Sequence, residues 1–431
     1  MKKQYLLPFL FILSLLISGC SGSKDEVVLA KSGFSSNVYM SGFPANRAIS
    51  DGFDHAAFDA SIIRSVLGPV NAAPAETSSS SSSAVDTENH LISPANLYLS
   101  LSSLAYMTDG TTRFQLMKLL GPSKLSELEE NLQMLWGSQF YQTSDAACLM
   151  GSSLWINDTL PVPEEKLSEL SEKYYTASYV GQPSNKKFNE SYRSWLSSMS
   201  AGLLDDQIGE TGLDPDMALQ SATSLFYKAQ FSQSFEASQT YEQTFHTPTT
   251  DVYVQMMHMD ESFPYHQDAL FDAAGLPMKN GATLWLLLPK EGTTPAALAA
   301  DQAVLNWLNA PSYDQEDLTL SVPRFDIIAQ LSLIDSLKAI GVDEIFNAKK
   351  ADFSGLSKEI QDCAVSRIDQ TLRVRVFEGG VEASAFAETV VVSSAAPEDA
   401  VVFRLNRPFM FALRDYDGTI LFAGIVNDPS K

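Results

Sequence analysis

The segment from Arg375 to Pro408 constrains the fold of this chain more than any other part of the sequence. A strand-like run, Leu372 to Phe377, leads into the glycine pair Gly379 and Gly380, where the backbone changes direction at little steric cost. A long stretch of small and β-branched residues follows, and a second strand-like run covers Ala400 to Leu405. The pattern indicates a long loop between two strands, with a flexible point at its beginning.

The side chains of this loop alternate as those of a strand would. One set is small and nearly free of charge, which suits a core, whereas the other set carries two glutamates, which suit water. The first set comprises Val381, Ala383, Ala385, Ala387, Thr389 and Val391, and the second comprises Glu382, Ser384, Phe386, Glu388, Val390 and Val392. The alternation behind a glycine pair predicts a segment that changes between a loop and a strand.

Two motifs of this region resemble the serpin family. The run Glu378-Gly379-Gly380-Val381-Glu382-Ala383-Ser384-Ala385 is similar to the hinge of the serpin reactive loop, and Phe403 to Leu413 (FRLNRPFMFAL) is similar to the C-terminal signature of that family. The resemblance extends from Asp51 to Pro429. It implies an α+β fold with a large, mainly antiparallel β-sheet, further sheets, about eight or nine helices and a mobile reactive-centre loop.

The resemblance also implies a mechanism. A serine or cysteine protease attacks the loop and forms an acyl-enzyme, and the hinge end of the loop then inserts as a new strand of the main sheet before water releases the protease. The chain would thus be a suicide-substrate inhibitor and not an enzyme. Ala383, Ala385 and Ala387 are small enough to enter the sheet, and Val381 stands where threonine or serine is usual.

The bond that the protease attacks is placed differently by two counts. Counting forward from the hinge by the usual length of the family gives Ser394-Ala395, and counting back from the C-terminal signature gives Pro397-Glu398. We favour Ser394-Ala395, because the inserted length governs trapping and proline is a poor residue before a scissile bond. The neighbouring bonds Ser393-Ser394 and Ala395-Ala396 stay open as alternatives.

The loop composition points to a class of target. No lysine or arginine lies between Arg375 and Arg404, so a trypsin-like pocket has no basic side chain to bind. The residues from Val391 to Ala395 are small or β-branched and suit a shallow apolar pocket. We expect an elastase-like or subtilisin-like serine protease as the partner, with small-residue cysteine proteases second. The alternative is a non-inhibitory serpin that acts as a binding protein or protease substrate, for which Val381 and Phe386 are the support.

The N-terminus has the pattern of a targeting signal. Basic residues precede the apolar run Tyr5 to Ile17, which is too short for a membrane span, and Ile17 to Cys20 resembles a bacterial lipobox with Cys20 as the lipid attachment site. An ordinary signal peptide is the alternative. We expect a lipoprotein signal peptide at 1–20, a flexible tether at 21–50, and one domain at 51–431 with a disordered serine-rich insertion at 71–89. The protein would then be lipid-anchored on a bacterial cell envelope, at the outer membrane or cell surface, with the lipid as its only membrane contact.

Composition argues against several other classes. Lys and Arg number 29 against 52 Asp and Glu, a net charge of −23, so nucleic acid and other polyanions are poor partners. None of the five histidines stands in a recognisable catalytic or metal-binding motif, so we expect no metal and no cofactor. An envelope hydrolase with an unrecognised site is the remaining enzyme hypothesis. We expect a monomer, with Cys148 and Cys363 as small buried hydrophobes.

Hydrophobic periodicity and cap residues predict the helices that position the loop. We expect a first helix from Asp51 to Val66, a buried helix from Pro94 to Met107, and an amphipathic helix from Ser191 to Leu204. The resemblance places the second of these under the main sheet and the third across its front. It also places Gln220 to Phe235 under the upper end of the loop, although Thr223, Ala229 and Phe231 replace the usual asparagine, glycine and tryptophan.

Overall fold

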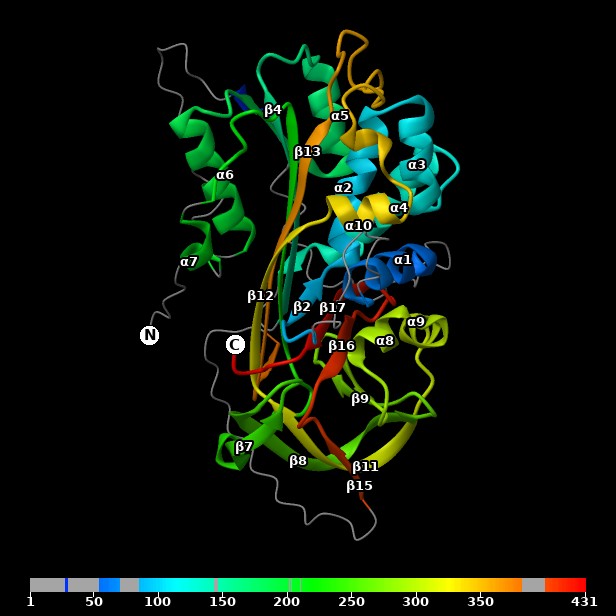
Figure 1. Cartoon of the computed structure of the whole chain (residues 1–431), viewed down its shortest axis with the longest axis vertical. Helices are drawn as coiled ribbons and strands as arrows, with labels where there is room; N and C mark the ends of the chain where they lie inside the picture. The colour runs from blue at the N-terminus through cyan, green and yellow to red at the C-terminus, as the bar shows by residue number, and fades with distance from the viewer. Residues whose placement is uncertain are drawn as a thin grey trace, which may run out of the picture.

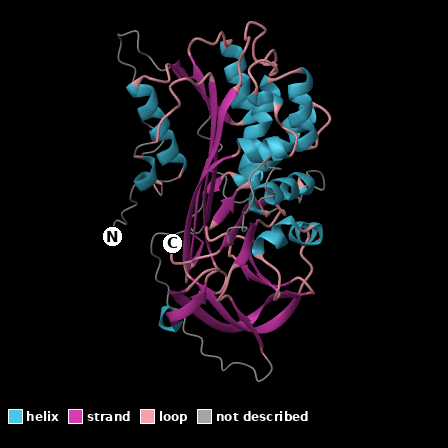
Figure 2. Cartoon of the chain, viewed as in Figure 1, coloured by secondary structure: helices cyan, strands magenta, loops and turns pink. Residues whose placement is uncertain are grey.

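The computed structural model describes residues 28–29, 54–69, 85–142, 146–200, 202, 204–209, 211–381 and 400–431. These residues form two β-sheets with helices packed against them (Figures 1 and 2). The helices are α1 (Ala56–Leu67), α2 (Pro94–Met107), α3 (Gly110–Leu120), α4 (Leu125–Gln139), α5 (Glu164–Tyr174), α6 (Lys186–Met199), α7 (Asp205–Ile208), α8 (Pro295–Ala300), α9 (Gln302–Asn309) and α10 (Ile334–Ala339). The mixed α+β class expected from the sequence is confirmed.

One of the two sheets, called the main sheet here, runs along the long axis of the molecule (Figure 1). Its strands lie in the order β1 (Val28–Leu29), β5 (Thr176–Gly181), β4 (Ala146–Asn157), β6 (Leu219–Gln230), β14 (Gly380–Val381), β13 (Val365–Phe377) and β12 (Phe325–Ser332), and β3 (Tyr141–Gln142) pairs with β4. Strands β6 and β13 are parallel, whereas β4 and β12 run antiparallel to their neighbours β6 and β13. Strands β6 and β13 are flanked on both sides by further strands and are the central strands of the sheet.

The second sheet is strongly curved and lies at the opposite pole from α6 (Figure 1). Its strands lie in the order β15 (Val401–Arg404), β11 (Asp314–Pro323), β8 (Asp251–Gln267), β9 (Phe271–Pro277), β10 (Thr283–Pro289), β16 (Phe409–Arg414), β17 (Ile420–Val426) and β2 (His90–Ile92), with β7 (Thr240–His246) paired to β8. Strand β16 comes from the signature FRLNRPFMFAL and is buried between β10 and β17. The second half of the signature thus lies in the interior of this sheet, whereas Phe403 and Arg404 belong to the edge strand β15.

The two faces of the main sheet are covered differently (Figure 1). Helix α2 is buried at every position behind the sheet, as its apolar sequence predicts, and Ser93 caps it by accepting a hydrogen bond from the Asn96 amide. Helix α6 covers the opposite face, called the front here, where Trp155, Phe188 and Tyr192 pack edge to face. The side-chain alternation of the central strands consequently separates a core face from a front face.

Helix α1 begins later than the sequence predicts, and helix α6 begins earlier. Helix α1 begins at Ala56 and not at Asp51, and its first amide is held by the carboxylate of Asp54. Helix α6 begins at Lys186 and ends at Met199, so the expected range from Ser191 to Leu204 was shifted. Its start is fixed by Asn185, whose side chain accepts hydrogen bonds from the amides of the first turn. Cap geometry, which periodicity does not report, decides both boundaries.

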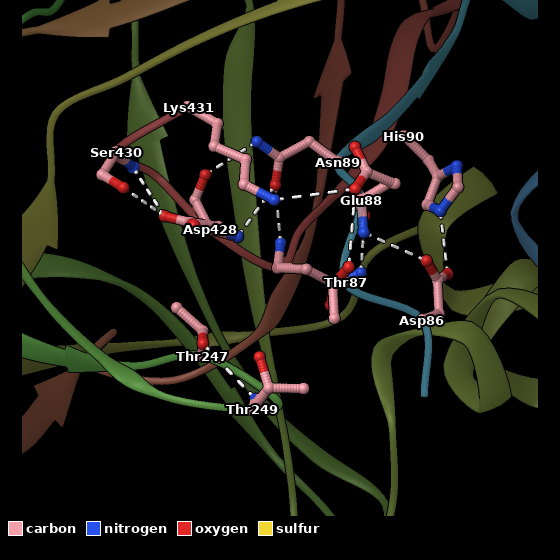
Figure 3. Close-up of polar contacts among 11 residues, drawn as sticks. Asp86, Thr87, Glu88, Asn89, His90, Thr247, Thr249, Asp428, Ser430 and Lys431 are labelled. Atoms are coloured by element: carbon pink, nitrogen blue, oxygen red, sulfur yellow. Dashed lines mark hydrogen bonds and ion pairs between the residues drawn. The ribbon is translucent and has the colours of Figure 1, made fainter. Parts of the chain in front are cut away.

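Of the expected serine-rich insertion at 71–89, residues 71–84 lie outside the described residues. Within the described part, the side chain of Asn89 donates to the carbonyl of Asp428 at 2.7 Å and accepts from the Asp428 amide at 2.9 Å (Figure 3). Lys431 adds an ion pair to Glu88 at 3.6 Å. The C-terminal tail therefore holds the residues that precede β2.

The two predicted buried cysteines are confirmed as free and buried. Cys148 lies in β4 and Cys363 lies just before β13. Burial raises the pKa of the Cys363 thiol to about 11 and that of Cys148 well above its ordinary value. Both side chains thus behave as small hydrophobes and not as reactive thiols.

Candidate functional site

The candidate site is the seam between the parallel strands β6 and β13. The two strands pair directly from Leu219 and Val365 up to Leu225 and Leu372. Beyond that point the two strands no longer pair with each other, and their last residues pair with β14 instead. The seam is consequently closed over its first part and split at the end nearer the second sheet, which is the lower end in Figure 1.

Strand β14 is the start of the predicted loop and lies inside this split. Gly380 pairs with Gln230 on one side and with Phe377 on the other, and Val381 pairs with Ala229 and Val376. The hinge therefore runs antiparallel to both central strands, as a further strand of the sheet would. Val381 is only 1% exposed, so it faces the core as its alternation predicts.

Gly380 is the residue that permits this close approach. Its φ of 152° lies outside the range that L-residues favour, and a Cβ atom there would meet the Ala229 carbonyl oxygen at 2.1 Å. The neighbouring Gly379 is also crowded, because a Cβ atom would lie 2.9 Å from the ring of Phe377. The glycine pair thus serves both the turn and the contact with β6.

Glu378 anchors the turn that leads into β14. The carboxylate accepts hydrogen bonds from Nε of Arg324 at 2.9 and 3.0 Å and from Oγ1 of Thr240 at 2.6 Å. Its backbone carbonyl accepts from the Phe235 amide at 2.9 Å. Burial works to raise the pKa of Glu378, but the hydrogen bonds from Arg324 and Thr240 outweigh it and lower that pKa below its ordinary value.

Comparison with known proteins assigns this architecture to a family. The model of the family Serpin, described as serine protease inhibitor, matches residues 76–429. This chain belongs to the serpin family. Its identity to the plasma serine protease inhibitor of Bos taurus is 27% over 360 residues, which cover 80% of this chain and 87% of the bovine protein. An uncharacterized serpin-like protein of Thermococcus kodakarensis is 29% identical over 296 residues, covering 64% of this chain and 66% of that protein.

Solved serpin structures share the fold. The native thermophilic serpin tengpin superposes with a TM-score of 0.76 at 20% identity, covering 89% of this chain and 95% of tengpin. Thyroxine-binding globulin in complex with thyroxine gives a TM-score of 0.73 at 21% identity, covering 87% of this chain and 99% of that protein. These likenesses confirm the serpin fold. Since one of the two structures is of a small-molecule complex, the fold alone does not define what a member does.

Where β6 and β13 pair directly, polar side chains connect this serpin's seam to α2. Gln370 of β13 accepts from the backbone amide of Ser93 at 2.8 Å and donates to its carbonyl at 3.1 Å. Ser100 of α2 and Ser221 of β6 share a hydrogen bond of 2.8 Å. Both central strands are thus connected to one buried helix, on the core face of the seam.

On the front face, the seam is crossed by a second polar cluster. Gln220 of β6 donates to Oδ2 of Asp369 in β13 at 3.2 Å and to the hydroxyl of Tyr192 in α6 at 3.3 Å. Arg367 pairs with Asp369 at 3.1 Å. Burial raises the pKa of Asp369, although Arg367 acts in the opposite direction. Burial raises the pKa of the Tyr192 hydroxyl too, so this residue acts as a neutral acceptor and donor.

Basic side chains line the front of the seam near its split end. Arg373 and Arg375 of β13 both bind Asp326 of β12, with closest contacts of 2.6 and 3.0 Å. Burial works to raise the pKa of Asp326, but the two guanidinium groups hold it below its ordinary value. Lys228 lies at the corresponding level of β6. The split end of the seam is therefore positively charged on the front.

Part of the predicted site lies outside the described residues. This applies to the hinge residues Glu382, Ala383, Ser384 and Ala385, to the reactive-bond residues Ser393, Ser394, Ala395 and Ala396, and to Cys20. Of the predicted hinge, the described part comprises Glu378 to Val381, which the structure brings together with β6 and β13. Sequence reasoning missed the partners Arg324, Thr240 and Gln370. No local signal marks them, because each lies far from its partner in the sequence.

The described residues contain neither of two other kinds of site. They hold no group of three or more His, Cys, Asp or Glu side chains suited to a metal. Within the same ranges, no helix has the length and apolarity needed to cross a membrane. The histidines serve local contacts, such as His258 with Ser321 at 3.0 Å and His246 with Asp251 at 2.8 Å.

Proposed function

We propose that this serpin is a suicide-substrate inhibitor of serine proteases that traps the acyl-enzyme by inserting its reactive loop between β6 and β13. The observation that carries the proposal is β14. Its two residues already pair with both central strands, so the start of the loop stands where an added strand would begin.

The geometry of the seam supports rapid insertion. Arg373 to Arg375 and the facing residues of β6 do not pair with each other, so the next residues of the loop can enter before any strand pair is broken. Insertion has to be faster than hydrolysis of the acyl-enzyme ester. An opening that already exists between the two strands shortens the time that insertion takes. Antiparallel pairing with both neighbours gives each inserted residue its backbone hydrogen bonds.

The target that we propose follows from the loop sequence. Small and β-branched residues from Val391 to Ala395 suit an elastase-like or subtilisin-like protease, with Ser394-Ala395 as the attacked bond. The absence of lysine and arginine from this part of the sequence argues against trypsin-like enzymes.

The test is a mixture of the soluble domain, without residues before Ser21, with pancreatic elastase on a denaturing gel. We expect a band at the summed mass, and mass spectrometry of the released peptide should begin at Ala395. Trypsin is the matched control and should form no stable complex. Cleavage without a complex by elastase and subtilisin alike would instead favour the non-inhibitory serpin.

We also propose that Cys20 carries a lipid that holds the inhibitor on a bacterial cell envelope, where it would guard the cell surface. The support is the run Ile17 to Cys20 behind a short apolar segment. Globomycin-sensitive processing and membrane fractionation test this proposal. Release of the protein into the medium, unchanged in a Cys20→Ser variant, would contradict it.

A further inference from the structure

His258 of β8 belongs to a row of side chains that crosses three strands of the second sheet. The register pairs His258 with Ser321 of β11, and it pairs Ser321 in turn with Arg404 of the edge strand β15. Residues directly opposite each other in a sheet project to the same face. The imidazole and the exposed guanidinium therefore share one face of the sheet, with the small side chain of Ser321 between them.

Contacts on two sides fix the imidazole of His258. Its Nδ1 lies 3.0 Å from the hydroxyl of Ser321, which is only 1% exposed. The ring of Tyr241 in β7 is nearly parallel to the imidazole, with ring centroids 4.4 Å apart and planes at 17°. The other nitrogen, Nε2, is buried and has no hydrogen-bond partner among the described residues. Because both nitrogens of an imidazolium carry a proton, protonation would leave a charged N–H group without an acceptor there.

The charges around His258 oppose its protonation. Among the described residues, the charged groups that act on it are Arg404 of β15 and Asp260, two residues further along β8. Burial and then Arg404 lower the pKa of His258 below its ordinary value of 6.5, and the opposing attraction of Asp260 is smaller. Stacking on the uncharged ring of Tyr241 acts in the same direction as Asp260, since an aromatic face attracts a cation.

Strand β15 is attached to the second sheet by a short pairing. Among the described strands it has one neighbour, because Val401–Arg404 pair in parallel with Leu318–Ser321 of β11 and β15 ends the strand order. The Leu405 amide adds a hydrogen bond of 2.9 Å to the Ser321 carbonyl, and the buried ring of Phe403 anchors the strand. A short edge strand of this kind opens locally more readily than the strands inside the sheet.

We propose that His258 makes the attachment of β15 sensitive to acid, because its protonation sets two positive charges on either side of Ser321 that local release of β15 separates. Above pH 6.5, where His258 is neutral, the row carries only the charge of Arg404. The released state binds the proton more readily than the attached state, so the attachment of β15 weakens as the pH falls below 6.5. This inference concerns only the pairing of β11 with β15 and does not depend on whether the protein traps a protease.

The experiment measures hydrogen exchange of the Phe403 and Leu405 amides at pH 7.5 and pH 5.5, on either side of the ordinary pKa of histidine. Rates are corrected for the intrinsic effect of pH on exchange. We expect the protection of both amides to fall about two- to fivefold in acid, relative to amides of β16. His258→Gln does not titrate and should show no such fall. Arg404→Gln removes the second charge and should show a smaller fall than the natural protein.

His246→Gln is the matched control. His246 lies in β7 of the same sheet, is 53% exposed and pairs with Asp251 at 2.8 Å, so its loss should leave the acid response of β15 intact. An equal response in the natural protein and in His258→Gln would overturn the proposal, as would full protection of β15 in acid. A response that requires His258 but is unchanged in Arg404→Gln would contradict repulsion across Ser321.

NMR titration of the His258 imidazole gives a second measurement on the unmodified protein. We expect its pKa to lie below 6.5 and to rise in Arg404→Gln, because the neighbouring positive charge is then absent. A pKa at or above 6.5 in the natural protein would show that Tyr241 and Asp260 outweigh burial and Arg404. The proposal would then be wrong even if both variants failed to fold.

Discussion

Glu378 is the residue on which the position of the hinge depends most directly. Its side chain is 13% exposed and binds both Arg324 and Thr240, whereas the Arg324 side chain is 45% exposed. Solvent therefore screens part of the attraction to Arg324, whereas the hydrogen bond from Thr240 is partly buried. These contacts hold the turn after β13 against β7.

Replacing Glu378 by alanine should lower the free energy of unfolding by about 1–2 kcal/mol. Because the folded pKa of Glu378 lies below its ordinary value of 4.5, its contribution is present above that value and is lost as the pH falls through the folded pKa. Urea unfolding between pH 7 and pH 3 checks this. The difference between the natural protein and Glu378→Ala should shrink in acid, and a constant difference would contradict the assignment. Arg324→Ala should not add fully to it.

Gly380 sets how closely the hinge approaches β6. Gly380→Ala should move β14 out of the seam and cost about 1–3 kcal/mol, since its Cβ atom would overlap the Ala229 carbonyl. Thermal unfolding and the yield of protease complex are the measurements, and both should fall. Gly137→Ala in α4 is the control, because nothing lies within 4 Å of a Cβ atom there. That change should stabilise the protein by about 0.5–1 kcal/mol. Unchanged stability of Gly380→Ala would show that β14 is not held as described.

At the scale of elements, the connection between α2 and β13 matters most for the seam. Ser93 and Gln370 are both fully buried, and the Gln370 carboxamide satisfies the amide and the carbonyl of Ser93. A backbone group that loses its partner in such a place cannot turn to water. The N-terminus of α2 and the centre of the sheet are consequently one cooperative unit.

Gln370→Ala should cost about 1–3 kcal/mol, because it leaves the buried amide of Ser93 without its partner, whereas the Ser93 carbonyl keeps its hydrogen bond from the Leu97 amide. Hydrogen exchange should become faster in α2 and in the part of β13 that pairs with β6, and remain unchanged in the second sheet. Gln330→Ala, an exposed glutamine of β12, serves as the control and should change the stability little. Equal protection of α2 in both variants would show that the helix is held by its apolar contacts alone.

At the scale of the whole molecule, the split seam leaves room in the main sheet for one further strand between β6 and β13. Among the described residues, only the two of β14 lie between the split ends of β6 and β13. A full added strand would contribute backbone hydrogen bonds on both sides and core contacts from its small side chains. The intact chain is therefore expected to be less stable than the same chain with its loop inserted.

Cleavage of the loop should raise the melting temperature by about 10 °C or more, since an inserted strand adds a ladder of hydrogen bonds on each side. Differential scanning calorimetry before and after limited elastase treatment measures the change. Ala385→Glu is the control, because it would bury a charge between Leu225 and Leu372, and it should abolish the gain. An equal gain in this variant would show that the loop does not insert in the register of β14.

The sequence alone was sufficient for the family and the α+β class, and it predicted the face of Val381 in the hinge. Local patterns carry these features: the glycine pair, the alternation that buries Val381, the apolar run of α2 and the signature that forms β16. Each depends on residues close together in the chain, where a spacing of two or about 3.6 residues directly reports a face. The limits of α1 and α6 were less well predicted, because single cap residues decide them.

Only the tertiary structure decided which distant residues hold the hinge and the seam. Arg324 and Glu378 are 54 positions apart, Ser93 and Gln370 are 277 apart, and Asn89 meets the C-terminal tail across 339 positions. No periodicity relates such pairs, since their contact depends on the order of strands in the sheet and on the register between them. Sequence patterns therefore predicted a loop able to become a strand. The folded sheet decided that β14, the start of this loop, lies between β6 and β13.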